Sequence, residues 1–215
     1  MNQITMDGKK QRVWLFGHFG LTNFGNESTL QAFLFHLHRL LPNAQVTCIC
    51  TGPEATASAY GIATLPISRT IISAWTPGTR AGRMLRSFVF GMPCEIFRWL
   101  DGLRTLKPHD IFVIPGTGLV SEAYGLTGWG PYNLFKWSLI AKLRGCKLLF
   151  VSVGAGPLYG RLGRFFAKSA LGLADLRSYR DASSLKYLQS IGFVKSTDRV
   201  YPDLAFSLPT CRLLR

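Results

Sequence analysis

Acidic side chains are scarce in this sequence. Its 215 residues include 11 Asp and Glu against 25 Lys and Arg, which gives a formal net charge of +14 at pH 7. Such an excess of cations predicts a positive surface potential that attracts anionic partners. Nucleic acid, anionic lipid and phosphorylated substrates all fit this potential, and charge alone does not rank them.

Disulfide and metal-binding patterns are missing as well. The five cysteines are an odd number, and none stands in a CxxC spacing or beside a histidine. We therefore expect no disulfide framework, no metal site and no bound cofactor. Cys48 and Cys50 are expected to point to one face of a strand as small buried hydrophobic residues.

The sequence has no long apolar run. No segment holds 18 consecutive apolar residues, and the apolar run near the N-terminus is too short for a signal peptide. With 47% hydrophobic residues and a mean hydropathy of +0.17, the chain can still bury a core. We expect a cytoplasmic protein, with peripheral association at the inner face of the membrane as a further option.

Short apolar runs alternate with helical patterns along the chain. Near-continuous apolar runs at residues 110–114 and 148–153 predict strands buried on both faces of a parallel sheet. Further strands are expected at residues 12–16, 45–50, 62–67, 176–179 and 199–201. Helical spacing follows at residues 27–41, between Pro131 and Gly145, and at 182–191. This alternation predicts an α/β fold with a doubly wound, mostly parallel Rossmann-like sheet. We expect one domain at residues 12–209, with tails at 1–11 and 210–215.

Residues 80–107 predict a helical stretch that is interrupted at residues 91–93. Arg80, Arg83 and Arg86 recur at an interval of three and share a face. A solvated helix face is the commoner explanation of such a pattern. The alternative is a helix that lies on anionic lipid. Its apolar counterpart would be Phe88, Val89, Phe90, Phe97 and Trp99.

Three glycine-containing loops, at residues 17–26, 116–118 and 154–156, each follow a predicted strand. Because parallel strands end at the same edge of a sheet, we expect these loops to converge there, although glycine also simply ends turns and helices. Backbone N–H groups beside an arginine suit a phosphate or carboxylate. No P-loop occurs, and the G-x-G-x-x-x-G spacing after residue 153 disfavours a dinucleotide. The substrate-binding candidates are Gly17, Asn23, Asn26, Gly116, Thr117, Gly118, Gly154, Gly156 and Arg180.

Two residues of the first loop are candidates for proton transfer. His18 titrates near neutral pH, although a loop histidine also serves as a hydrogen-bonding spacer. Glu27, at the expected start of the first helix with Asn26 as its N-cap, is the second candidate. Arg180 either contacts an anionic ligand or pairs with Asp181, the expected N-cap of the next helix.

Five segments in series resemble one known family. FGHFGLTNFGNESTLQAF (residues 16–33) is similar to the opening of the polysaccharide pyruvyl transferase family. DIFVIPGTGLVSE (110–122) and VSVGAGPL (151–158) follow in the family's order. LADLRSYRDASSLKYLQSIG (173–192) and VYPDLAF (200–206) complete the series, and their RDxxS and PDxAF patterns are the most specific part. The resemblance covers roughly residues 12–209.

This resemblance implies a transferase that moves the enolpyruvyl group of phosphoenolpyruvate onto a sugar of a cell-surface polysaccharide as a pyruvate ketal. The implied partners are phosphoenolpyruvate and a sugar or lipid-linked oligosaccharide acceptor. Nucleic acid is not expected as a partner, because the basic residues are not interleaved with aromatic ones in any recognisable module. The family resembles two-domain transferases of GT-B type, and the matching segments belong to the N-terminal half, so a second domain is expected to be absent. Fold alone leaves two alternatives, a sugar-nucleotide glycosyltransferase and a non-catalytic basic module at an anionic membrane or glycan surface.

Overall fold

The chain folds around a seven-stranded, all-parallel sheet with the strand order β3-β2-β1-β4-β5-β6-β7. The computed structural model describes residues 10–67, 92–116, 118–122 and 129–209. The order 3-2-1-4-5-6 is that of the Rossmann fold. The strands are β1 (Arg12–Gly17), β2 (Gln45–Cys50), β3 (Ala63–Pro66), β4 (Ile111–Pro115), β5 (Lys147–Val153), β6 (Leu176–Tyr179) and β7 (Arg199–Val200).

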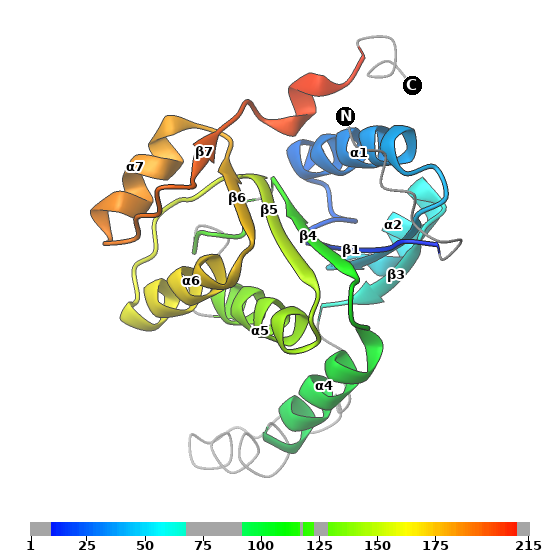
Figure 1. Cartoon of the computed structure of the whole chain (residues 1–215), viewed down its shortest axis with the longest axis horizontal. Helices are drawn as coiled ribbons and strands as arrows, with labels where there is room; N and C mark the ends of the chain where they lie inside the picture. The colour runs from blue at the N-terminus through cyan, green and yellow to red at the C-terminus, as the bar shows by residue number, and fades with distance from the viewer. Residues whose placement is uncertain (1–9, 68–91, 117, 123–128, 210–215) are drawn as a thin grey trace.

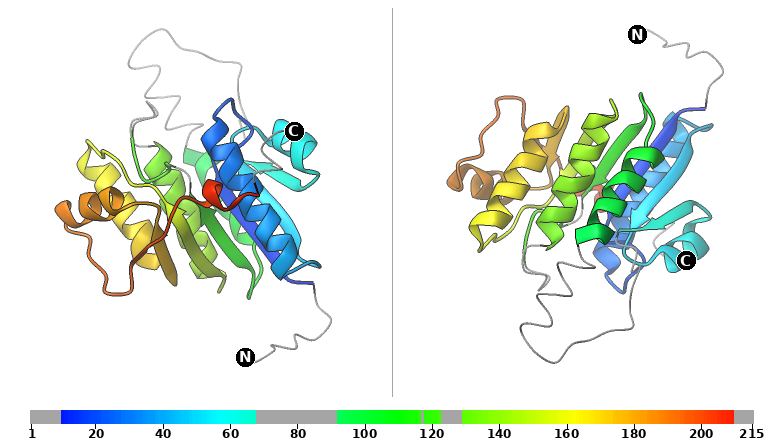
Figure 2. Two further views of the ribbon diagram at one scale, coloured as in Figure 1. Left: turned by 90° about the horizontal axis from the view of Figure 1, so that it is seen from above. Right: turned by 90° about the horizontal axis from the view of Figure 1, so that it is seen from below.

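Helices cover both faces of this sheet (Figure 1). One face carries α1 (Phe24–Leu40), beside which the short 3₁₀ helix η2 (Leu204–Ser207) lies. The other face carries α4 (Met92–Thr105), α5 (Trp129–Leu143) and α6 (Arg161–Leu173), which lie side by side (Figure 2). The other helices among the described residues are α2 (Pro53–Tyr60) and α7 (Ala182–Ser190). The doubly wound α/β fold predicted from the sequence is confirmed.

The central strands are buried on both faces, as their continuous apolar runs predict. In β1, Val13 and Leu15 pack toward α1, whereas Trp14 and Phe16 pack toward α5. Phe16 and Phe112 stack with their ring centroids 6.3 Å apart, and Trp137 of α5 extends this stack. Each buried large side chain of this kind contributes about 1.5–3 kcal/mol to folding.

The first helix begins earlier than the sequence predicts. We expected a helix over residues 27–41 with Asn26 as its N-cap, but α1 begins at Phe24 and its N-cap is Asn23. The Asn23 side chain accepts hydrogen bonds from the backbone N–H groups of Gly25 and Asn26. Asn23 and Asn26 are the same residue type. Asn23 is the cap because its side-chain oxygen reaches backbone N–H groups of the first turn, which have no partner within the helix.

Three other helix ends follow the predicted signals, and one does not. Asp181 caps α7 by accepting a 2.6 Å hydrogen bond from the Ser184 N–H. Gly61 and Gly145, after α2 and α5, have φ of 64° and 72°, a backbone region that glycine enters at little cost. Pro131 was expected to open α5, yet the helix starts two residues earlier, at Trp129. The arginine face at 80–86 lies outside the described residues.

Candidate functional site

The strand order reverses between β1 and β4, and this reversal places the candidate site. The helix after β1 covers one face of the sheet and the helix after β4 covers the other. The segments that leave these two strands at the carboxyl edge therefore turn to opposite faces. Ligands of open α/β sheets bind at this switch point. The structure brings together the ends of β1, β4 and β5, and hence the three glycine loops.

The loop after β1 is fastened to the first turn of α1. The Asn26 side chain, which is buried, donates to the carbonyl oxygen of His18 over 3.0 Å. Glu27 accepts hydrogen bonds on both carboxylate oxygens, from the Gly20 N–H at 2.8 Å and from the Tyr60 hydroxyl at 3.0 Å. Asn23, Asn26 and Glu27 therefore shape the loop through their own hydrogen bonds. Their roles toward a ligand stay predictions.

His18 lies directly beyond Gly17, the last residue of β1. Its Nδ1 is 2.8 Å from the Thr51 hydroxyl oxygen, at the end of the neighbouring β2. Burial lowers the pKa of His18 below 6.5, because the charged imidazolium loses hydration there. A neutral imidazole at pH 7 is able to accept a proton. The acid–base role of His18 stays a prediction.

The loops after β4 and β5 are joined to each other. The Gly156 N–H donates to Val120 O over 2.9 Å, and the Glu122 N–H donates to Pro157 O over 3.0 Å. A Cβ on Gly156 would stand 3.0 Å from Cβ of Ser121, so the two chains approach closely. Gly118 accepts a hydrogen bond from the Ser121 hydroxyl. Thr117 lies outside the described residues.

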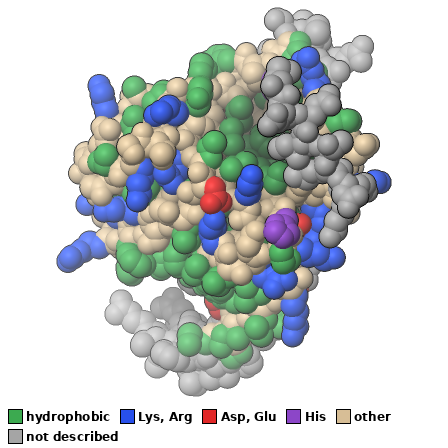
Figure 3. Space-filling view, in the orientation of Figure 1, with side chains coloured by type: hydrophobic (Ala, Val, Ile, Leu, Met, Phe, Trp, Pro, Cys, Tyr) green, Lys and Arg blue, Asp and Glu red, His purple; other side chains and the backbone are tan. Residues whose placement is uncertain are grey.

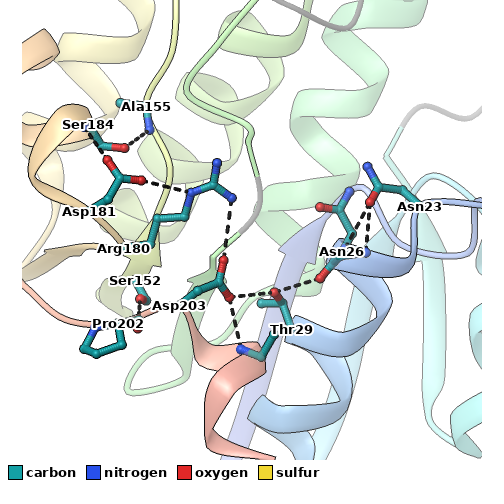
Figure 4. A network of polar contacts seen from close by, with 12 residues as sticks. Asn23, Asn26, Thr29, Ser152, Ala155, Arg180, Asp181, Ser184, Pro202 and Asp203 are labelled. Carbon is teal, nitrogen blue, oxygen red and sulfur yellow. Dashed lines mark hydrogen bonds and ion pairs between the residues drawn. The ribbon is translucent and has the colours of Figure 1, made fainter. Parts of the chain in front are cut away.

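Arg180 lies at the centre of a polar network at this edge (Figure 4). Its Nε is 3.3 Å from Asp181 Oδ2, and its Nη1 is 3.6 Å from Asp203 Oδ2. Gly154 leaves space for the guanidinium, because a Cβ there would come within 2.7 Å of Arg180 Cζ. The ion pair with Asp181 was one of the two predicted explanations of Arg180, and it is present. Contact with an anionic ligand stays a prediction.

Asp203 connects this arginine to α1 and to η2. Its Oδ1 accepts from the Ala205 N–H at 3.0 Å, as the N-cap of η2, and lies 3.4 Å from the Thr29 hydroxyl. Thr29 is buried in α1 and also donates to Gly25 O over 3.0 Å. The segment after β7 is thus tied across the sheet edge to the helix after β1.

Ser152 fixes the same segment from β5. It is buried near the end of the strand, where pairing with β6 is irregular, and its φ is 54°. Its hydroxyl donates to Pro202 O over 2.7 Å, and its carbonyl oxygen would be 2.5 Å from a Cβ on Gly116. Non-glycine residues in such a conformation cost about 1–3 kcal/mol and gather at functional sites.

Sequence reasoning missed Thr29, Ser152, Ser184 and Asp203 as members of this network. Asp203 and Ser184 stand in the PDxAF and RDxxS patterns, so a signal was present. Ser152 is a polar residue inside an otherwise apolar strand, which was a weaker signal. Thr29 sits on the buried side of an ordinary helix, and its sequence context gives no signal.

The net charge of the Arg180 network does not by itself favour an anionic ligand. One guanidinium faces two carboxylates, so Arg180, Asp181 and Asp203 together carry a formal charge of −1. An anion at this point needs additional donors, and backbone N–H groups at the loop ends are of that kind. Within the described ranges, no group of three or more His, Cys, Asp or Glu side chains could hold a metal ion.

One comparison with known proteins decides the family. The family model for polysaccharide pyruvyl transferases matches residues 23–211. The chain belongs to this family. The pyruvyl transferase match begins at Asn23, so it includes Arg180 and Asp203, whereas Gly17 and His18 precede it. A search of curated proteins finds no match. Membership in a transferase family supports a pyruvyl transferase-like function, with a sugar or polysaccharide as acceptor.

Proposed function

We propose that this protein acts in the transfer of the enolpyruvyl group of phosphoenolpyruvate to a sugar of a cell-surface polysaccharide, which yields a pyruvate ketal. The observation that carries the proposal is the family match, whose span contains the Arg180 network at the switch point of the sheet. The formal charge of +14 supports it further, because phosphoenolpyruvate is a small polyanion.

Ketal formation sets the chemical needs of the site. Two sugar hydroxyls each lose a proton and bond to C2 of the enolpyruvyl group. One of these protons is gained by the methylene carbon, and the other leaves with the phosphate as the C2–O bond to phosphate breaks. A group that accepts a hydroxyl proton and can return it to carbon serves both steps. His18 is our candidate for the acceptor, since burial lowers its pKa and so favours the neutral imidazole that can take up a proton.

The glycine loops allow close packing at the same edge. Gly116 and Gly154 stand against Ser152 and Arg180 with no room for a side chain. A ligand above them meets backbone and the partly exposed guanidinium of Arg180. We assign to Arg180 the contact with the donor carboxylate or phosphate, with Asp181 and Asp203 holding its orientation.

A thermal-shift titration of the full chain with phosphoenolpyruvate tests this function. Ligand at 100 times its dissociation constant adds about 2.7 kcal/mol, which corresponds to roughly 5–10 °C in a chain of this size. We expect phosphoenolpyruvate to raise the Tm, and inorganic phosphate to do so less. Arg180→Ala should abolish the shift, whereas Lys186→Ala, on the exposed side of α7, should keep it.

Other outcomes assign the protein differently. Stabilisation by a nucleotide sugar, with none by phosphoenolpyruvate, would identify a glycosyltransferase donor site on this fold. A folded chain that responds to neither compound would have no donor contact of its own, which contradicts the proposal.

A further inference from the structure

A basic groove runs along the outer side of α6, away from the Arg180 network. It lies between α6 and the segment that follows α7, and its volume is about 670 Å³. Four of its lining residues are cationic, and none is acidic. The cationic residues are Arg161, Arg164, Lys168 and Lys195.

No carboxylate neutralises these four cations within the described part of the chain. Arg164 donates to Leu158 O and Lys168 donates to Ile191 O, so each binds a neutral carbonyl rather than an anion. Two carboxylates lie near α6, and each has other partners. Glu122 accepts from the N–H groups of Tyr159 and Gly160, and Asp198 pairs with Arg177. Figure 3 shows Lys and Arg side chains gathered over the α6–α7 end of the molecule, with few acidic ones.

Apolar side chains stand exposed among these cations. Leu162 is 70% exposed and Phe165 58% exposed on α6, and Val194 is 68% exposed on the opposite wall of the groove. The other side of α6 packs against the sheet through Ala167, Ala170 and Leu171. Exposed apolar side chains beside cations suit a lipid interface, because apolar side chains enter the headgroup region while Lys and Arg meet the lipid phosphates.

We propose that this groove docks onto the surface of an anionic lipid bilayer. Lipid phosphates enter the groove between Arg161 and Lys195, while Leu162 and Val194 insert among the headgroups. The mixed character of the surface favours lipid over nucleic acid, because the phosphates of a nucleic acid leave exposed aliphatic side chains without partners. α6 begins directly after the loop that contains Gly154 and Gly156, so docking brings the carboxyl edge of the sheet close to the membrane.

Vesicle co-sedimentation of the full chain tests the proposal. The chain should bind vesicles of phosphatidylglycerol and phosphatidylcholine, and bind pure phosphatidylcholine at least tenfold more weakly. The double variant Arg161→Gln/Lys195→Gln should weaken binding to the anionic vesicles about 30-fold, since each Lys or Arg near such a surface contributes about fivefold. Both side chains are exposed, so the variant should keep the Tm of the parent chain.

A matched variant separates the groove from overall charge. Arg104→Gln/Lys107→Gln removes the same charge at exposed positions at the end of α4 and should change binding less than threefold. Leu162→Gln/Val194→Gln keeps the charge and should weaken binding about tenfold. Equal losses in the two charge variants would overturn the proposal, as would failure of the parent chain to bind anionic vesicles. Displacement from the vesicles by a single-stranded oligonucleotide, with stronger binding to it than to lipid, would also overturn it.

Discussion

The candidate site contains glycines at positions that have no space for a larger side chain. The sequence marks Gly116 and Gly154 as substrate-binding candidates, and the structure shows a packing reason for each to be glycine. A Cβ on Gly116 would collide with a backbone carbonyl of β5, and one on Gly154 with the guanidinium of Arg180. The first obstacle is rigid, whereas the second is the end of a flexible side chain. The two glycines should therefore respond differently to substitution.

Gly116→Ala should lower the free energy of unfolding by about 1–3 kcal/mol, because Ser152 O cannot withdraw without disturbing β5. Urea unfolding measures the loss. Gly172→Ala, near the end of α6 with open space around its Cα, is the matched control and should be neutral or stabilise by up to about 1 kcal/mol. Equal effects of the two substitutions would contradict the close approach at Gly116.

Asp203→Ala should lower the free energy of unfolding by about 1–2 kcal/mol, since it removes the cap of η2 and the partner of Arg180. Asp203→Asn keeps a capping oxygen and should lose less. If both variants unfold at the same urea concentration as the parent chain, the connection between Arg180 and α1 contributes nothing to stability.

Sequence reasoning reached part of this residue network. Arg180 and Asp181 were recognised because a charged pair after an apolar strand stands out, and Asp181 before a helical pattern is a good N-cap. Thr29 and Ser152 were not recognised, because each gains its role from a segment more than 45 residues away in the sequence. Such long-range contacts leave no local pattern.

At the scale of elements, the start of α1 was predicted three residues too late. Asn23 and Asn26 are the same residue type, and sequence alone does not say which oxygen faces the free N–H groups. Asn23→Ala should cost about 1 kcal/mol in urea unfolding, whereas Asn23→Asp keeps the cap and should be neutral or better at the positive helix end. A loss as large for Asn23→Asp would contradict the capping role.

A buried ion pair fastens β6 to the segment before β7. Arg177 Nε lies 2.7 Å from Asp198 Oδ1, and both side chains are buried. The same guanidinium donates to the carbonyls of Leu171 and Ala174 at the end of α6. Burial and the charge of Asp198 raise the pKa of Tyr179, whose hydroxyl donates to the second oxygen of this carboxylate.

Asp198→Ala should destabilise the protein by about 3–5 kcal/mol, because it leaves the Arg177 charge buried without its partner. Lys142→Gln is the control, since its pair with Asp175 is partly exposed and worth less than about 1 kcal/mol. Urea unfolding of both variants gives the comparison. A cost for Asp198→Ala no larger than that of the control would mean that water reaches Arg177.

At the scale of the whole molecule, excess positive charge opposes compactness. The formal charge of +14 belongs to a chain of 215 residues, so its cations repel each other. Raising NaCl from about 10 to 150 mM shortens the screening distance from roughly 30 to 8 Å. We expect the Tm to rise over this range. A falling Tm would mean that specific ion pairs outweigh the general repulsion.

The architecture was predictable because strand and helix signals alternate along almost the whole chain. Apolar runs on the strands and Gly or Asn at helix ends gave the order of the elements, and the parallel sheet follows from that order. The likeness to a two-domain GT-B-type transferase stays a prediction, as does the donor. The fold alone does not determine which group is transferred.

The outermost strands of the sheet are short, and this matters for behaviour at high concentration. β3 has four residues and ends in proline, and β7 has two residues that lie beside the positively charged end of the molecule. A foreign strand can therefore form few backbone hydrogen bonds at either side. A protein whose sheet offers so little to pair with should resist growth into fibrils, even though its central strands are almost entirely apolar.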